Sequence, residues 1–504
     1  MFAAQAALRA AALFALAPLG ETSAADWLQF GYDAQHSGNN PEERVITRDN
    51  VAQLTLFHAI DLLSPPEETL AAPVYLARVP TPAGLRNFAF VLAEAGSLYA
   101  IDVATGAIAW SHVQPPPEDF FHVTQSSPAI DPNRQFVYAY QLDGKVHKFA
   151  VGDGTEIVDV GWPEIVTLKP QWEHVASALA IATAANGRSY LYAVTDGYYG
   201  DGGDYQGHVT AIDLASGEQK VFNSLCSDIT THFIENGEPG VTACNSTMSG
   251  IWGRPGAVYD AGTDRVLVAT SNGWFDANIG GYDWGDSVLA LAPDGSGGGF
   301  GLPLDSFSPD NYDELRQSDL DFGAASPAIV PAPAGSAYRH LGVQMGKDGL
   351  LHLLNLDDMS GTGTPGMIGG DLQTLTIATT IPTNPIPQPA TWIDAGDGST
   401  WLYVPTVADG LAALEVEIGD GGLPSLAVRW TLHGTISTPV VANNIVFWSG
   451  HALDPRTGNA IADGMPNCCY WGGPIVVDGR VIVTGGYNQV WIYGIDAVFA
   501  NGFD

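Results

Sequence analysis

A short phrase recurs along the chain: in most copies, a small residue and a proline precede an apolar run of a few residues. Proline is tolerated at the first residue of a strand, where its missing N–H breaks no ladder hydrogen bond, so each phrase predicts the start of a β-strand. Seven copies end at Tyr75, Ile130, Tyr259, Ile329, Ile393, Val441 and Val476, and a degenerate copy without proline ends at Ile181.

Each start is followed by a second β-type run and then by a third run that ends in a turn rich in Asp, Gly or Ser. Successive units lie about 35 to 80 residues apart, which brackets the blade period of a β-propeller plus loop insertions. Short strands, tight turns and almost no helical periodicity complete this pattern. The third runs occupy residues 97–102, 145–154, 208–217, 287–295, 350–358, 410–421, 451–458 and 489–496.

The repeat therefore predicts an all-β, eight-bladed β-propeller of four-stranded antiparallel blades. Seven blades remain an alternative if the short units near residues 437–496 are miscounted. A parallel β-helix would need shorter repeats, and a two-sheet sandwich would not repeat eight times. We expect one propeller domain over residues 26–496 and a C-terminal tail over residues 497–504. The segment 26–40, with the run 54–60, is expected to supply the outer strand that closes the ring.

The first 25 residues have the composition of a secretory signal. One basic side chain, Arg9, precedes an apolar run from Ala10 to Leu19, and small residues follow up to Ala25. No later stretch reaches the roughly 20 uninterrupted apolar residues that a membrane helix needs. The sequence thus predicts a signal peptide over residues 1–25, secretion to the periplasm or the extracellular space, and no membrane span.

The formal charge of −36 arises from 55 acidic against 19 basic residues, and the acids are spread along all 504 residues. Such a surface repels nucleic acid and acidic membranes, so no nucleic-acid partner is expected. It is typical of a soluble exported protein that resists aggregation.

Four cysteines occur, and export favours their oxidation. Cys226 and Cys244 bracket a loop rich in polar residues and glycine, which suits a local disulfide. Cys468 and Cys469 are adjacent, so they form a strained vicinal ring, stay free or pair elsewhere. Three full pairings are possible, and the sequence does not choose among them.

Residues 100–110, AIDVATGAIAW, match in full the tryptophan-docking motif A-x-D-x-x-T-G-x-x-x-W of the pyrroloquinoline quinone (PQQ) propellers, and residues 208–217 and 451–458 are partial copies. The chain thus resembles the PQQ-like β-propeller repeat family, which includes the quinoprotein alcohol dehydrogenases. The resemblance implies that Trp110 packs on a turn of the neighbouring blade, where a large flat side chain buries much area at low entropic cost.

In the dehydrogenases of that family, the quinone lies on a Trp at the centre of the ring, beside a calcium ion held by a carboxylate and an Asn, with an Asp as base. The resemblance places the stacking Trp at Trp252, in GIWGRPG, and the metal-binding Asn at Asn272, in ATSNG. Asp283 or Asp286 falls near the catalytic Asp, in a register that is off by about two residues. The alternatives are a core aromatic for Trp252 and a turn or capping Asp for either acid.

No Glu stands where the family carries its metal-binding Glu, so Asp201 or Asp204 would substitute for it. Lys347, in GKDGLLHLL, aligns with the Lys or Arg that contacts the quinone, and the alternative is a surface lysine in a hairpin turn. PQQ carries three carboxylates, which need cations or N–H donors to replace water. The family's early Arg has no match, which leaves Lys347, Arg254 and Arg316 for this role.

The resemblance implies a quinoprotein oxidoreductase that oxidises an alcohol or a sugar with PQQ and Ca²⁺, since the quinone is the electron sink and oxygen ligands suit calcium. No C-x-x-C-H haem motif occurs, so a separate acceptor would take the electrons. The adjacent Cys468 and Cys469 are similar to the vicinal disulfide that covers the quinone in some members, where the pair comes early in the chain. The alternative is a non-catalytic propeller that binds a protein or a glycan, as the outer-membrane assembly propellers do.

Overall fold

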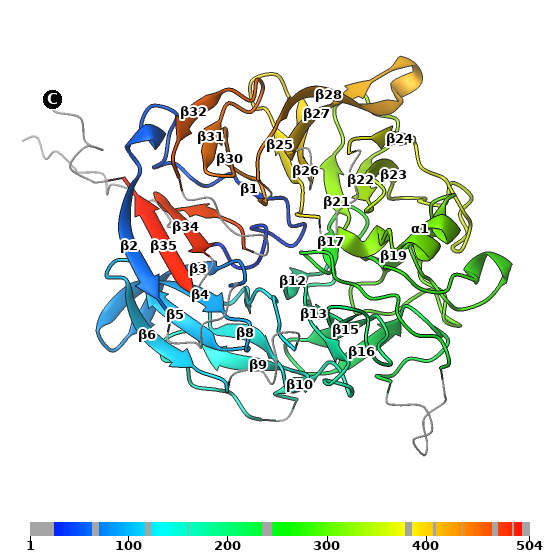
Figure 1. The fold of residues 1–504 in the computed structure, drawn as a ribbon, viewed down its shortest axis with the longest axis horizontal. Helices are drawn as coiled ribbons and strands as arrows, with labels where there is room; N and C mark the ends of the chain where they lie inside the picture. Colours follow the sequence, from blue (N-terminus) through cyan, green and yellow to red (C-terminus); the bar gives the residue numbers. More distant parts are fainter. Residues whose placement is uncertain are drawn as a thin grey trace, which may run out of the picture.

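Eight small sheets stand around a central axis in the computed structural model of the chain (Figure 1). The structure describes residues 25–62, 70–115, 122–159, 161–233, 244–378, 386–406, 410–435, 437–465, 472–485 and 488–495. The eight-bladed propeller is therefore confirmed, and the seven-bladed alternative is wrong. The expected signal peptide, the expected tail and both adjacent cysteines lie outside the described residues, apart from Ala25.

The first four blades are antiparallel meanders of four strands each. They comprise β3 (Val74–Thr81), β4 (Gly84–Leu92), β5 (Leu98–Asp102) and β6 (Ala107–His112); β7 (Ala129–Ile130), β8 (Phe136–Gln141), β9 (Lys145–Ala150) and β10 (Glu164–Ile165); β12 (Ala180–Thr183), β13 (Ser189–Val194), β15 (His208–Asp213) and β16 (Gln219–Asn223); and β17 (Val258–Asp260), β18 (Arg265–Ala269), β19 (Val288–Leu291) and β20 (Asp305–Phe307).

The other four blades follow the same order, and the last takes its outer strand from the start of the chain. They comprise β21 (Ala328–Pro331), β22 (His340–Met345), β23 (Leu350–Asn355) and β24 (Gln373–Thr376); β25 (Ala390–Ile393), β26 (Thr400–Thr406), β27 (Gly410–Ile418) and β28 (Pro424–Leu432); β29 (Val440–Ala442), β30 (Ile445–Trp448), β31 (His451–Leu453) and β32 (Ala460–Asp463); and β33 (Ile475–Val477), β34 (Arg480–Gly485), β35 (Gln489–Gly494) and β2 (Thr55–Asp61).

The recurring phrases mark fixed places in these blades. Each of the eight starts lies at an innermost strand, and each third run contains the third strand of its blade. Most residues of the third strands are buried because both faces of a blade pack on neighbouring blades, as in β5, where all five residues are buried. The outer strands face solvent in part, as the mostly exposed or half-buried β6 shows.

The run 54–60 closes the ring as expected, because β2 pairs antiparallel with β35. The expectation for residues 26–40 is wrong, since this segment adds no outer strand. It follows the inside of the ring, and β1 (Asn39–Asn40) pairs in parallel with the innermost strand β29. Hydrogen bonds from residues 27–40 reach Tyr75, Ile130, Ile181, Tyr259, Thr391, Val441 and Val476, each on a different blade. The segment thus satisfies inner strand edges that would otherwise lack partners.

Trp110 lies between the first two blades. Its Nε1 donates a hydrogen bond to the carbonyl of Val151 at 3.1 Å, and its ring covers Gly154, where a Cβ atom would stand only 2.6 Å from the ring. Trp430 makes the same contact between the sixth and seventh blades, with a hydrogen bond to the Pro455 carbonyl and its ring over Gly458. Glycine in both turns therefore lets a Trp of one blade lie flat on the next.

Candidate functional site

Long connections gather on one face of the ring, over the third, fourth and fifth blades. Because neighbouring strands of a meander run in opposite directions, the links from second to third strand and the links between blades leave the ring on the same face. The long links of this kind include residues 195–207, 224–257, 270–287 and 308–327. The cofactor, metal and catalytic residues expected from the sequence lie on these links, except Lys347, which lies on the short link between β22 and β23.

Trp252 and Lys347 lie together at this face. The half-buried Trp252 donates a hydrogen bond from Nε1 to the Ser271 hydroxyl, which fixes the plane of its ring. The Nζ of Lys347 stands 5.1 Å from the centre of that ring and forms an ion pair with Asp321. Lys347 is buried, so its position is set by these two contacts rather than by solvent.

Asn272 joins the same group through two hydrogen bonds. Its backbone N–H donates to Asp321 Oδ1 at 3.1 Å, and its side-chain Nδ2 donates to Asp319 Oδ1 at 2.7 Å. The remaining atom, Oδ1, is buried and accepts no hydrogen bond from any residue that the structure describes. Asp321 therefore links the Trp252–Lys347 pair to an amide oxygen that is free to accept a ligand.

Two further carboxylates approach this group from the third blade. Burial raises the pKa of Asp196 well above its usual range, and the charges of Asp201 and Asp321 raise it further, whereas Lys347 lowers it. Tyr205 donates a hydrogen bond to Asp201 Oδ1 at 2.6 Å. The charge of Asp201 thus acts on Asp196, and Asp196 in turn responds to the charges of Asp321 and Lys347. Asp196 lies deeper within the site than Asp201.

The two expected catalytic acids differ in their surroundings. Asp283 accepts the Cys226 backbone N–H and the Ser246 hydroxyl, both at 2.7 Å, so both of its oxygens are occupied. Asp286 accepts the Phe322 backbone N–H at 3.1 Å through Oδ1, while its buried Oδ2 has no partner among the described residues. Burial raises the pKa of both groups, and that of Asp286 lies well above its usual range.

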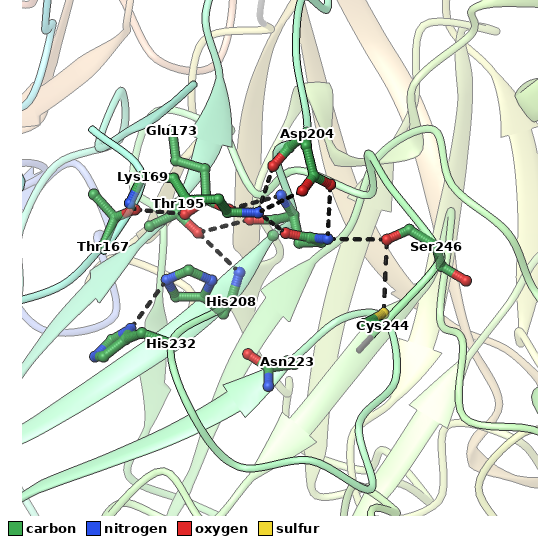
Figure 2. A network of polar contacts seen from close by, with 12 residues as sticks. Thr167, Lys169, Glu173, Thr195, Asp204, His208, Asn223, His232, Cys244 and Ser246 are labelled. Carbon is green, nitrogen blue, oxygen red and sulfur yellow. Dashed lines mark hydrogen bonds and ion pairs between the residues drawn. The ribbon is translucent and has the colours of Figure 1, made fainter. Parts of the chain in front are cut away.

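Asp204 belongs to a separate buried network at the edge of this face (Figure 2). Lys169 donates to the Asp204 carbonyl and to Gln206 Oε1, and its Nζ lies 3.2 Å from Glu173 Oε1 and 3.8 Å from Asp204 Oδ2. Glu173 also accepts hydrogen bonds from the Thr167 hydroxyl and the Gln206 backbone N–H. Glu173 lies on β11 (Glu173–His174), which pairs with β14 (Asp196–Gly197), so the network supports the strand that carries Asp196.

The two arginines expected near the cofactor lie apart from Trp252. Arg254 is buried, donates to the carbonyls of Gln125 and Ala176, and lies 5.2 Å from the centre of the Phe30 ring. Arg316 belongs to α1 (Tyr312–Ser318), and its guanidinium lies 5.0 Å from the centre of the Trp274 ring. Lys347 is thus the cation that the structure brings to Trp252.

A disulfide joins Cys226 to Cys244, the local pairing that the polar, glycine-rich loop between them suits. Asp283 holds the residues at both ends of this loop through its bonds to Cys226 and Ser246. Asp283 lies on the link 270–287, which also carries Asn272, and donates its backbone N–H to Asp276 on the same link. The disulfide loop is therefore held to this link.

Sequence reasoning missed Asp196, Asp319 and Asp321. The last two form the D-L-D stretch that lies five residues before the phrase SPAI of the fifth blade, and their position next to Asn272 depends on the packing of two long links. A usable signal was present, because an acidic pair just before a strand start falls on the same face as a residue just after a second strand.

No cluster of three or more His, Cys, Asp or Glu side chains with metal-binding geometry occurs in the part of the chain that the structure describes. The oxygen donors near Trp252 include an amide, which lies outside that set. Within the same described ranges, none of the helices has the length and apolar character that crossing a bilayer requires.

Comparisons with known proteins agree with this architecture. A family model described as outer membrane protein assembly factor BamB matches residues 67–234. A europium-containing methanol dehydrogenase superposes with a TM-score of 0.64 at 15% identity, over 94% of this chain and 98% of its own. A quinohemoprotein alcohol dehydrogenase from Comamonas testosteroni superposes with a TM-score of 0.62 at 16% identity, over 94% of this chain and 80% of its own. No curated protein matches the sequence.

These matches confirm the resemblance to the PQQ-like β-propellers. At such low identities, the likeness to the solved structures establishes the fold alone, and the activity has to be argued from the residues above the ring.

Proposed function

We propose that this protein is a secreted quinoprotein-type oxidoreductase that binds PQQ over Trp252, holds a hard cation beside Asn272, and oxidises an alcohol or a sugar. The observation that carries the proposal is the convergence of Trp252, Lys347, Asp321, Asn272 and Asp319 on one spot, from links that belong to the fourth and fifth blades. The dehydrogenase names of two superposed structures support it.

The residues fit such a cofactor in two respects. The buried Oδ1 of Asn272 accepts no hydrogen bond from any described residue, and a hard cation would bind it together with the carboxylate of Asp321. The ring of Trp252 is held by Ser271 and stands beside the ammonium group of Lys347, so a flat anionic ligand would meet an aromatic face and a cation at once. Asp196 is the carboxylate of the third blade best placed to add to this set, because the charges of Asp321 and Lys347 both act on it.

When bound, PQQ supplies an electron sink that accepts hydride from the substrate carbon. Asp319 is the group that we assign to hold the hydroxyl proton, because its carboxylate is exposed at the face of the ring and is oriented by Asn272. Asp286 is a poorer base, because burial raises its pKa and favours its neutral form. Lys347 offsets the charge of Asp321, so that the charged groups beside Trp252 are not carboxylates alone.

Dye-linked oxidation of a panel of alcohols and sugars tests this proposal, after incubation of the full chain with PQQ and either Ca²⁺ or Eu³⁺. We expect turnover that requires both PQQ and a cation, and we expect Asp319→Asn to lower kcat at least about 100-fold through loss of the general base. Asp286→Asn is the matched comparison and should retain most of the activity. Turnover that is equally reduced in both variants would contradict the assignment of Asp319.

A second candidate is a protein-binding propeller without a cofactor. It is favoured by one observation, the match of residues 67–234 to the BamB model. This candidate predicts that the charge and aromatic residues over Trp252 can be replaced without loss of partner binding. Cross-linking of wild type and of Trp252→Ala to proteins in an extract of the source cells separates the two candidates. Only the binding scaffold predicts cross-linked partner products, and it predicts the same products for both proteins.

A further inference from the structure

A small cavity lies between the segment 27–40 and the inner ends of four blades, and we call it the hub cavity. Trp27 lines it from the segment. The residues that line it from points just before the innermost strands of the first, sixth, seventh and eighth blades include Ala72, Gln388, Thr438 and Gly473. The cavity therefore lies where the start of the chain meets the first and the last blades.

Three buried polar atoms of the lining residues have no hydrogen-bond partner among the residues that the structure describes. They are Nε1 of Trp27, Oε1 of Gln388 and Oγ1 of Thr438. Trp27 and Gln388 are 1% exposed, and Thr438 is 4% exposed. The Gln388 amide is oriented by a hydrogen bond from its Nε2 to the Pro327 carbonyl at 3.2 Å, so Oε1 is the atom that still needs a donor. Because a buried polar group without a partner keeps its desolvation cost, these atoms favour a molecule that bonds to them.

The size of the hub cavity limits what it holds. The space open to the centre of a water-sized molecule is about 10 Å³. A single buried water needs about 10 to 15 Å³ of such space. The cavity therefore holds one molecule of this size and is too small for an organic ligand.

The three polar atoms select a neutral molecule that both donates and accepts hydrogen bonds. The Trp27 N–H only donates, Gln388 Oε1 only accepts, and the Thr438 hydroxyl does either, so neither a cation nor a halide ion suits all three. The described residues that line the cavity include no Asp, Glu, Lys or Arg. Both ring nitrogens of His36 lie within hydrogen-bond distance of backbone carbonyls, and burial lowers the pKa of this ring. The lining therefore carries no charge that would attract an ion.

We infer that the hub cavity binds one ordered water molecule, which accepts a hydrogen bond from Trp27, donates one to Gln388 and bonds to the Thr438 hydroxyl. Buried waters typically make about three such bonds. The water joins the segment 27–40 to the sixth and seventh blades, in addition to the pairing of β1 with β29. The site needs no cofactor over Trp252, so it stands or falls apart from the proposed function.

Two measurements on the full chain test this site. High-resolution crystallography should show one peak of electron density within about 3.2 Å of all three polar atoms. Oxygen-17 magnetic relaxation dispersion, which counts water molecules held inside a protein for much longer than those at its surface, should count this water in solution. A hub cavity without density between well-ordered side chains would overturn the inference, as would a peak that contacts only one of the three atoms.

Gly473→Ala locates the water, because it adds one methyl group to the lining of the cavity. The added Cβ would stand 3.4 Å from its nearest neighbour, the Cβ of Thr438, which is an ordinary van der Waals contact. We expect the number of long-held waters to fall by about one, since the remaining space is too small for water. Gly202→Ala makes the same change at an exposed position where a Cβ would meet no atom within 4 Å, and the number should not change there. An unchanged number in Gly473→Ala would contradict the inference.

A second pair of variants at Thr438 tests the bonds themselves. Thr438→Val keeps the shape of the side chain and removes the hydroxyl, so the residence time of the water should shorten about tenfold through loss of one of its hydrogen bonds. Thr438→Ser keeps the hydroxyl and should leave the residence time nearly unchanged. The same relaxation dispersion measures both, and it decides the matter even if Gly473→Ala does not fold. Equal residence times in wild type and Thr438→Val would contradict the inference.

Discussion

Two buried lysine–carboxylate pairs lie on the same face of this propeller, and they differ in how completely their surroundings are satisfied. Lys169 and Glu173 bond to each other, to Thr167 and to Gln206, and neither residue has an unpaired buried polar atom (Figure 2). Lys347 and Asp321 also form a pair, but Asn272 Oδ1, which adjoins it, lacks a partner in the described part of the chain.

The difference separates structural support from a binding site. A buried polar network stabilises a fold only when every donor and acceptor is used, because each unpaired group keeps its desolvation cost. The Lys169 network meets this condition and holds the strand pair that carries Asp196. The Lys347 group does not meet it, and an amide oxygen that accepts no hydrogen bond from any described residue is available to a ligand. We therefore expect substitutions in the two places to affect different properties.

The largest effect is expected in the Lys169 network. Lys169→Met leaves Glu173 buried without a cation, which should lower the free energy of unfolding by about 3 to 5 kcal/mol. Chemical denaturation measures this loss. Lys220→Met is the matched control, since it breaks a surface pair with Asp294 and should cost about 1 kcal/mol or less. If Lys169→Met is as mild as the control, the network does not support the fold as described.

A smaller loss of stability, with a larger loss of binding, is expected at Lys347. In Lys347→Met, stability should fall by only about 2 kcal/mol, because the side chain of Asp321 is 9% exposed and can still reach water, whereas that of Glu173 is 0% exposed. Affinity for PQQ should fall more than about tenfold, through loss of a charge-assisted contact. Lys347→Arg should keep most of the affinity. If Lys347→Met loses stability but binds PQQ normally, then Lys347 supports the fold, as Lys169 does, and does not contact the cofactor.

The smallest expected change in the free energy of unfolding is that of Asp286→Asn. The corresponding change at Glu173, in the Lys169 network, has the opposite sign. Asp286→Asn removes a buried acid with an unpaired oxygen and should raise the free energy of unfolding at pH 7 by about 1 kcal/mol. Glu173→Gln leaves Lys169 buried without its carboxylate partner and should lower the free energy of unfolding. Because the folded pKa of Asp286 is raised above 3.8, its ionisation costs stability as pH rises from 3.8 through the folded pKa.

The gain in Asp286→Asn should therefore grow between pH 4 and pH 8 and be smallest below pH 4. Thermal unfolding of wild type and variant across this range measures it. A gain that is the same at all pH values would show that the pKa of Asp286 is the same in the folded and the unfolded protein, and would contradict the rise assigned to burial.

The fold was predictable because its signals are local. A proline at a strand start, a third run that ends in a turn, and the docking motif at Trp110 each depend on neighbouring residues, and the repeat adds them together. The segment 27–40 was misjudged because its partners are inner strand edges of seven blades, which no local pattern reveals.

The candidate site could be predicted in part for the same reason. Trp252, Asn272 and Lys347 stand in short phrases next to strands, so the resemblance could place them. Asp319 and Asp321 lie at the end of a long link that contains α1, and their approach to Asn272 follows from the packing of that link on residues 270–287. Long links vary freely in length, and sequence spacing alone therefore does not fix where their side chains arrive.

Titration calorimetry of the purified full chain with PQQ in the presence of Ca²⁺ tests the central claim most directly. The account predicts tight binding that requires the cation, is lost in Trp252→Ala and persists in the control Lys220→Met. No binding to folded wild-type protein, or equal binding by Trp252→Ala, would contradict the quinone site and leave a propeller that binds a protein or a glycan.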